Sequence, residues 1–121
     1  MLNMKALARL GLWPLLAFTT FMALSPKPPA TPLDQMGDKF THMTAFAVLT
    51  LVARIGYPMT SSLRVLERMA LFGALIEVFQ AIPSLHRNCD WRDWVADMVA
   101  TSAMLVIHGI VAGRLRLSSR A

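Results

Sequence analysis

Four apolar runs, each close to the length needed to cross a lipid bilayer, constrain this chain more than any other feature. They extend over about residues 7–24, 38–57, 63–82 and 91–113. A membrane-spanning helix needs about 20 predominantly apolar residues. Prolines or short polar links separate the runs, and proline ends helices because it has no backbone N–H. The pattern predicts an all-α fold, an integral membrane bundle of four transmembrane helices in a single domain over residues 1–121.

Composition favours lipid as the solvent for much of the surface. Hydrophobic residues make up 55% of the 121 residues and charged residues 16%, whereas soluble domains carry about 25% charged residues. The net charge is +5, but the basic residues lie at the ends of apolar runs and not along one stripe with aromatic residues, so no nucleic-acid partner is expected. The alternative is a soluble four-helix bundle, whose helices should each show a polar stripe. None of these runs has a continuous one.

The first run has the order of parts found in a secretory signal peptide. Lys5 and Arg9 precede an apolar stretch over residues 10–24. The stretch leads into residues 25–32, which hold four prolines and offer no clean small-x-small cleavage site. We expect a retained first helix, with a cleaved signal as the alternative.

The distribution of charge predicts an orientation. Cytoplasmic segments of membrane proteins are enriched in lysine and arginine. The first tail, the second loop and the last tail hold eight of these residues, and the two other loops hold four. We therefore expect both termini in the cytoplasm, with the last basic residues fraying from the fourth helix. Six of the seven carboxylates then fall on the outer half: Asp34, Asp38, Glu77, Asp90, Asp93 and Asp97.

Eight polar residues are expected to meet at the outer end of the bundle and form a ligand-binding site. They are Asp38, Lys39, His42, Glu77, Gln80, Arg87, Asp93 and Asp97. At about 1.5 Å per residue, His42, Glu77 and Asp97 lie roughly one turn inside the outer boundary of three different helices. Ionisable groups inside apolar segments are costly, so their default interpretation is a functional site.

These residue types allow several kinds of chemistry. Arg87 offers a planar fork for phosphate or carboxylate, and Lys39 adds a point charge. Glu77 is a candidate general acid, Asp93 its ionised counterpart and His42 a proton shuttle. The same groups also suit a structural ion-pair network that fixes helix register. A metal site built from His42, Glu77, Asp93 and Asp97 is a further alternative, but without a local HExxH-type motif we predict no metal and no other cofactor.

Two tryptophans and the single cysteine lie close to these polar residues in the sequence. Trp91 and Trp94 flank the start of the fourth run and are expected to anchor it at the membrane interface. Cys89 is the only cysteine, so there is no intrachain disulfide. It is expected either to pair between chains or to remain a free thiol.

Four short motifs follow one another along most of the chain. They are D-K-x-x-H-x-x-x-F at 38–46, E-x-x-Q at 77–80, P-x-x-x-R at 83–87 and D-x-x-x-D at 93–97. Together, over about residues 36–113, they resemble the VanZ-like family of small bacterial multi-pass membrane proteins, whose namesake is associated with resistance to the glycopeptide teicoplanin. The sequence departs from the family where Asp97 replaces an Asn and where Thr101 replaces a Gly.

The resemblance implies a place in the bacterial cytoplasmic (inner) membrane and a function in the cell envelope. One interpretation is a non-enzymatic protein that binds a lipid headgroup, a cell-wall lipid precursor or a glycopeptide-like ligand. A second is an enzyme that acts on a lipid-linked phosphate, such as a polyprenyl phosphate, at the outer leaflet. A third is a purely structural or partner-binding protein. An enzyme requires His42, Glu77 and Asp93 around an open pocket with a group left unpaired, whereas a closed cluster of paired groups favours the other interpretations.

Overall fold

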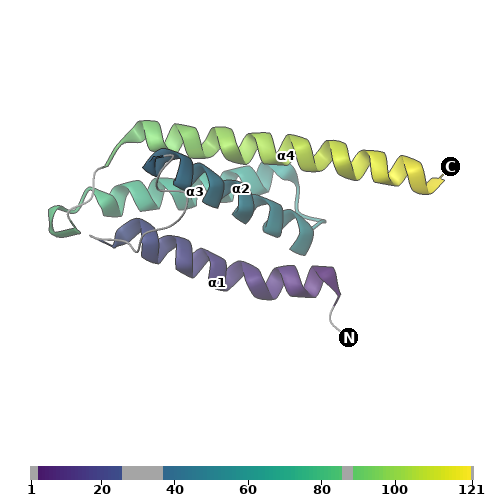
Figure 1. Ribbon diagram of the computed structural model, residues 1–121, viewed down its shortest axis with the longest axis horizontal. Coiled ribbons are helices and arrows are strands. Elements are labelled where there is room, and N and C mark those ends of the chain that lie inside the picture. Colours follow the sequence, from purple (N-terminus) through teal and green to yellow (C-terminus); the bar gives the residue numbers. More distant parts are fainter. Residues whose placement is uncertain (1–2, 26–36, 86–88, 121) are drawn as a thin grey trace.

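Four α-helices make up the protein, as the sequence predicts. The computed structural model describes residues 3–25, 37–85 and 89–120. The helices are α1 (Met4–Leu24), α2 (Asp38–Gly56), α3 (Ser62–Gln80) and α4 (Trp91–Arg120), and the 3-10 helix η2 (Pro83–Leu85) lies between the last two (Figure 1). The all-α, four-helix prediction is confirmed.

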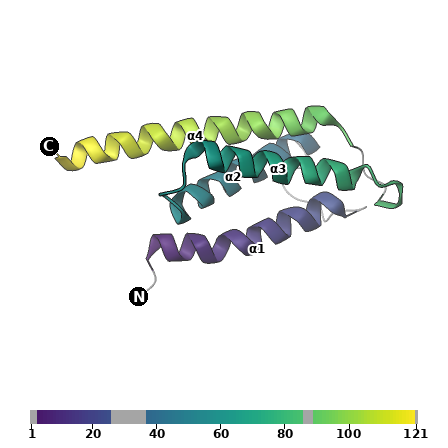
Figure 2. The same cartoon turned by 180° about the vertical axis from the view of Figure 1, so that it is seen from behind.

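Successive helices run in opposite directions, so the bundle has two distinct ends. The start of α1 and the end of α4 lie together at one end, and the turn between α2 and α3 is also there (Figures 1 and 2). The end of α1, the start of α2, the end of α3 and the start of α4 gather at the other end. Helix α2 makes its most extensive contacts with α4 and α1, and α3 packs mainly on α4. The topology therefore brings segments far apart in the sequence to the same end.

Local sequence signals set where the helices begin. The side chain of Asn3 accepts a hydrogen bond from the N–H of Ala6 (2.8 Å) and caps α1. Ser61 caps α3 in the same way, accepting from the N–H of Arg64 (3.2 Å). Such caps satisfy backbone donors that have no partner within the helix. Before α2 the chain turns at Gly37 with φ of 101°, a conformation that only glycine adopts at little cost.

The last helix is longer than expected. We expected it to end near residue 113 and the basic tail to fray, and this is wrong, because α4 continues to Arg120. The tail consists mainly of Arg and Leu, which are good helix formers, and holds no proline. With 30 residues, α4 is about 45 Å long at 1.5 Å per residue. Its last turns extend beyond the other helices (Figure 1).

Large apolar side chains cover much of the outer surface of the bundle. Trp13 on α1 is 64% exposed, Leu71 on α3 62% and Ile107 on α4 54%. Considering length and composition in the described ranges, two helices, α1 and α4, are long and apolar enough to cross a membrane. Helices α2 and α3 are 19 residues each and carry three and four charged residues. A water-soluble monomer rarely exposes large contiguous apolar patches.

Candidate functional site

The predicted polar residues on three helices come together at one end of the bundle, which we call the polar end. Lys39 lies in the first turn of α2, Glu77 in the last turn of α3 and Asp93 in the first turn of α4. The ammonium Nζ of Lys39 lies 3.7 Å from Oδ1 of Asp93. The Lys39 side chain is 50% exposed and that of Asp93 17%. The pair therefore joins α2 to α4 while leaving the cation accessible from outside.

Glu77 is held by the segment that leads into α4. Its Oε2 accepts a hydrogen bond from the backbone N–H of Asp90 (2.9 Å). The thiol of Cys89 also bonds to this carboxylate, and His42 lies close enough to interact with its charge. The carboxylate of Glu77 is thus bound by groups of its own chain.

The contact with Glu77 changes the acidity of the single thiol. Cys89 is exposed overall, but local desolvation raises the pKa of its thiol above the ordinary value, and the hydrogen bond to Glu77 and the negative charges of Glu77 and Asp90 raise it further. A raised pKa lowers the fraction of reactive thiolate at neutral pH. The contact with Glu77 therefore disfavours the reactive thiolate form of Cys89.

Two of the predicted ligand-binding residues face the interior. Asp97 is 4% exposed and Gln80 2%. The side-chain Nε2 of Gln80 donates to the backbone carbonyl of Ala23 at the end of α1 (2.9 Å). Thr101, one turn after Asp97 on α4, is fully buried. Gln80 therefore joins α3 to α1 in this structure, and Asp97 and Thr101 form a buried polar strip on α4.

The side chains of Asp38 and Arg87, two predicted ligand-binding residues, are not described by the structure. Asp38 begins α2, and Arg87 lies outside the described residues. Their part in ligand binding stays a prediction. Over the parts of the chain that the structure describes, no three His, Cys, Asp or Glu residues are grouped so that they could hold a metal ion.

Sequence reasoning missed the contact that fixes α4 on α3. We expected Trp94 to be an interfacial anchor, but its indole Nε1 donates to the backbone carbonyl of Ala70 (3.0 Å). The ring also covers Gly73, where an added Cβ would lie 3.0 Å from Cδ1 of Trp94. Ala70 and Gly73, small residues three apart in α3, are the sequence signal for this close approach. Trp91, by contrast, is 69% exposed, as an anchor would be.

A second set of polar contacts lies at the opposite end of the bundle. Nε of Arg9 on α1 donates to the carbonyl of Gly56 at the end of α2 (2.6 Å), and its guanidinium lies 4.8 Å from the ring centroid of Tyr57. Arg54 donates to the carbonyl of Thr60 in the turn that follows. These arginines bind the carbonyls that a helix end and a turn leave without helical partners.

Comparison with known proteins adds no assignment. No family model matches this chain, and no match is found among curated proteins or among solved structures. The resemblance to the VanZ-like family, carried by the motifs at 38–46, 77–80, 83–87 and 93–97, stays a prediction.

Proposed function

We propose that the protein is a multi-pass membrane protein of the bacterial cell envelope, VanZ-like, in which all four helices span the cytoplasmic membrane. Two helices satisfy the length and composition of a span unaided. Helices α2 and α3 lie between them and present exposed apolar residues such as Val48 and Leu71. The charged residues of α2 and α3 lie in the first two turns or the last turn of each helix, where long side chains reach the membrane interface. Lipid around the bundle accounts for the exposed apolar surface.

The excess of basic residues at the opposite end supports an orientation with the polar end on the outer side of the membrane and both termini in the cytoplasm. At that end Lys39 is half exposed beside Asp93. A lysine at the interface of an apolar bundle is suited to the phosphate of a lipid headgroup. The function that this geometry supports best is non-enzymatic binding of an anionic headgroup, of a membrane lipid or of a polyprenyl-phosphate cell-wall precursor.

The observation that carries this proposal is the partnering of the carboxylates. Glu77 is bound by the N–H of Asp90, and Asp93 is paired with Lys39. A general acid or base has to be within reach of a substrate proton, and carboxylates already bound by their own chain favour binding over catalysis. The exposed half of Lys39 leaves a cation available to a ligand.

A first experiment tests the membrane location. Membranes from cells that express the protein are washed with alkaline carbonate, which strips peripheral proteins from the bilayer. We expect the protein to stay in the pellet and to need detergent for release. Recovery in the carbonate supernatant would instead support the soluble four-helix bundle.

A second experiment tests the binding site. The protein in detergent is titrated with a short-chain polyprenyl phosphate, with the matching polyprenol as the uncharged probe, and binding is followed by native mass spectrometry. A hydrogen bond to a charged group contributes about 1.5 kcal/mol, so Lys39→Gln is expected to weaken phosphate binding by about tenfold. Lys5→Gln, at the opposite end, should have no effect. Equal binding of phosphate and alcohol, or no loss in Lys39→Gln, would contradict the proposal.

A further inference from the structure

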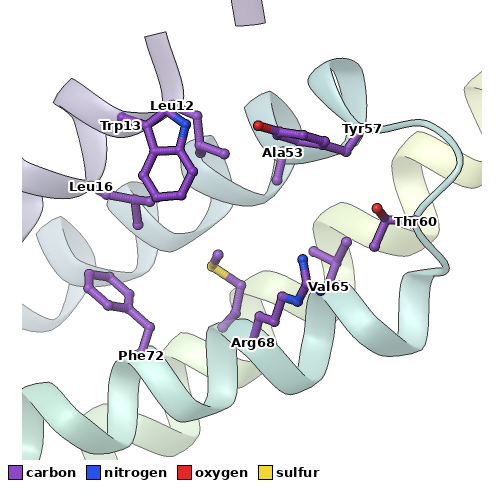
Figure 3. Close-up of a pocket in the computed structure, with 10 residues that line it drawn as sticks. Leu12, Trp13, Leu16, Ala53, Tyr57, Thr60, Val65, Arg68 and Phe72 are labelled. Atoms are coloured by element: carbon purple, nitrogen blue, oxygen red, sulfur yellow. The ribbon is translucent and has the colours of Figure 1, made fainter. Parts of the chain in front are cut away.

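A cavity of about 360 Å³ lies between α1, α2 and α3, in the half of the bundle away from the polar end (Figure 3). We call it the lateral cavity. Its inner wall is apolar, with Leu16 from α1, Ala53 from α2 and Phe72 from α3. Trp13 also lines it and is 64% exposed. The cavity is therefore open to the surroundings of the bundle, which the proposed function takes to be lipid.

One side of the lateral cavity is polar and positively charged. Tyr57, Thr60 and Arg68 line it near the turn between α2 and α3, with Phe72 and Leu16 towards the other side (Figure 3). In the described part of the chain no carboxylate forms an ion pair with Arg68. Arg68 and Phe72 are four residues apart on α3, so their backbone positions are about 6 Å apart along the helix axis.

This combination matches the chemistry of an anionic phospholipid. A chain of methylene groups suits the apolar wall, and a phosphate suits a guanidinium that has no carboxylate partner. The volume lies at the small end of the range for ligand cavities, roughly 300 to 1,000 Å³, which is enough for part of one acyl chain. Tyrosine and tryptophan with polar atoms at a membrane interface are typical of the headgroup level.

We propose that the lateral cavity binds one acyl chain of an anionic phospholipid of the cytoplasmic leaflet, with the lipid phosphate at Arg68. The inference rests on the proposed membrane location and adds a second lipid site, in the leaflet opposite to the polar end. Net charge favours an anionic over a zwitterionic lipid, because Arg64 and Arg68 begin α3 and Arg54 ends α2, with Glu67 as the one acidic residue at this end among those described.

Trp13 provides a direct probe of the lateral cavity. The chain has three tryptophans, so a Trp91→Phe, Trp94→Phe background leaves Trp13 as the sole fluorophore. This background is reconstituted in phosphatidylcholine vesicles that contain either brominated phosphatidylglycerol or brominated phosphatidylcholine, and quenching of Trp13 is measured. One basic residue near the surface favours an anionic lipid by about fivefold. We expect that preference in the background protein and its loss in Arg68→Gln.

Arg64→Gln is the matched control. It removes the same charge one turn earlier on α3, from a residue that does not line the lateral cavity. Its preference for phosphatidylglycerol should remain. Equal losses in both variants would show general attraction to an anionic surface, and no preference in the background protein would mean that lipid or a second copy covers the groove without selection. Either result overturns the inference.

A second measurement uses the wild-type chain and does not require the Trp91→Phe, Trp94→Phe protein to fold. Native mass spectrometry should show a phosphatidylglycerol adduct that Arg68→Gln loses and that Lys39→Gln keeps. The two proposals fail differently. Protein that does not insert into vesicles contradicts the membrane location, whereas inserted protein that binds the polyprenyl phosphate without selecting phosphatidylglycerol contradicts the lateral cavity alone.

Discussion

Gly73 sets how closely α3 and α4 approach each other. A Cβ at this position would lie 3.0 Å from Cδ1 of Trp94 and 3.3 Å from Cζ of Phe46. The indole of Trp94 is fixed by its bond to the carbonyl of Ala70, so it cannot move aside without losing a hydrogen bond. A single methyl group is therefore enough to strain the contact between the two helices.

Gly73→Ala is predicted to destabilise the bundle. Overpacking costs about 1–3 kcal/mol, against a gain of about 1 kcal/mol from the better helix propensity of alanine. Thermal unfolding in detergent should show a midpoint lower by about 4 °C. Gly109→Ala is the control, because nothing lies within 4 Å of a Cβ there; its midpoint should stay or rise. Equal midpoints for both variants would contradict the packing account.

The acidity of Cys89 gives a prediction about Glu77. Besides desolvation, the carboxylate of Glu77 raises the pKa of the thiol, so removing its charge should lower that pKa. At neutral pH, below the thiol pKa, the thiolate fraction then increases. Glu77→Gln should be alkylated by iodoacetamide faster than the wild type, and the pH at which the rate is half-maximal should fall.

Glu67→Gln serves as the comparison for that rate. Glu67 lies on α3 near the other end of the bundle and is exposed. Its replacement should therefore leave the rate of Cys89 alkylation unchanged. An unchanged rate in Glu77→Gln as well would mean that Glu77 and Cys89 do not interact in the protein.

The sequence identifies residues whose burial in an apolar run costs free energy. It does not identify their hydrogen-bond partners, because these depend on how the helices are oriented. Glu77 and Asp93 were identified because charges inside apolar runs need partners, and the structure places them at one end of the bundle. That Glu77 binds the N–H of Asp90, and Gln80 the carbonyl of Ala23, depends on the rotation of each helix about its axis. Apolar runs without a polar stripe leave that rotation undefined.

At the scale of helices, hydrogen bonds near both ends of α1 attach it to the rest of the bundle. Arg9 donates to the carbonyl of Gly56, and Gln80 donates to the carbonyl of Ala23. Between these two points α1 forms one wall of the lateral cavity. The attached helix therefore carries part of the lining of that cavity.

Replacing Gln80 tests this attachment. Gln80→Met keeps the length of the side chain but removes the donor to Ala23, and we expect a loss of about 1–2 kcal/mol. Helix α1 should then become more accessible, measured as faster amide hydrogen exchange over residues 18–24. Val78→Met changes an exposed neighbour on the same helix and should leave the exchange of α1 unchanged. Slow exchange in Gln80→Met would show that apolar packing alone holds α1.

Three helices begin within one residue of the predicted start, whereas α1 begins three residues earlier and α4 ends seven residues later than predicted. Asn3 and Ser61 are capping residues whose signal lies in the local sequence. The end of α4 has no such signal, since a basic tail can either fray or continue as helix. Its continuation to Arg120 follows from the helix propensity of Arg and Leu, which the interruption of the apolar pattern near residue 113 obscured.

For the whole molecule, the order and direction of the helices follow from the apolar runs and the short links between them. Membrane insertion and orientation remain predictions, and the single cysteine makes them testable. Cys89 is exposed at the polar end. A membrane-impermeant maleimide should label it in intact spheroplasts.

The reference for this labelling is a cysteine at the opposite end. In a Cys89→Ser, Ser118→Cys protein, the thiol lies on an exposed residue near the end of α4. It should be labelled only after the membrane is permeabilised. Labelling of both positions from outside, or of Ser118→Cys alone, would contradict the proposed orientation.

The hydrogen bonds that attach α1 join residues that are synthesised at different times. The partners are 47 residues apart for Arg9 and Gly56 and 57 apart for Ala23 and Gln80. At about 5–20 residues per second during synthesis, the residue that binds Ala23 is made roughly 3 to 11 s after Ala23 itself. If α1 spans the membrane as proposed, it has to remain in the bilayer during that interval without its later partners. The length and apolar character of α1, which are sufficient for a span, then serve biogenesis as much as the finished bundle.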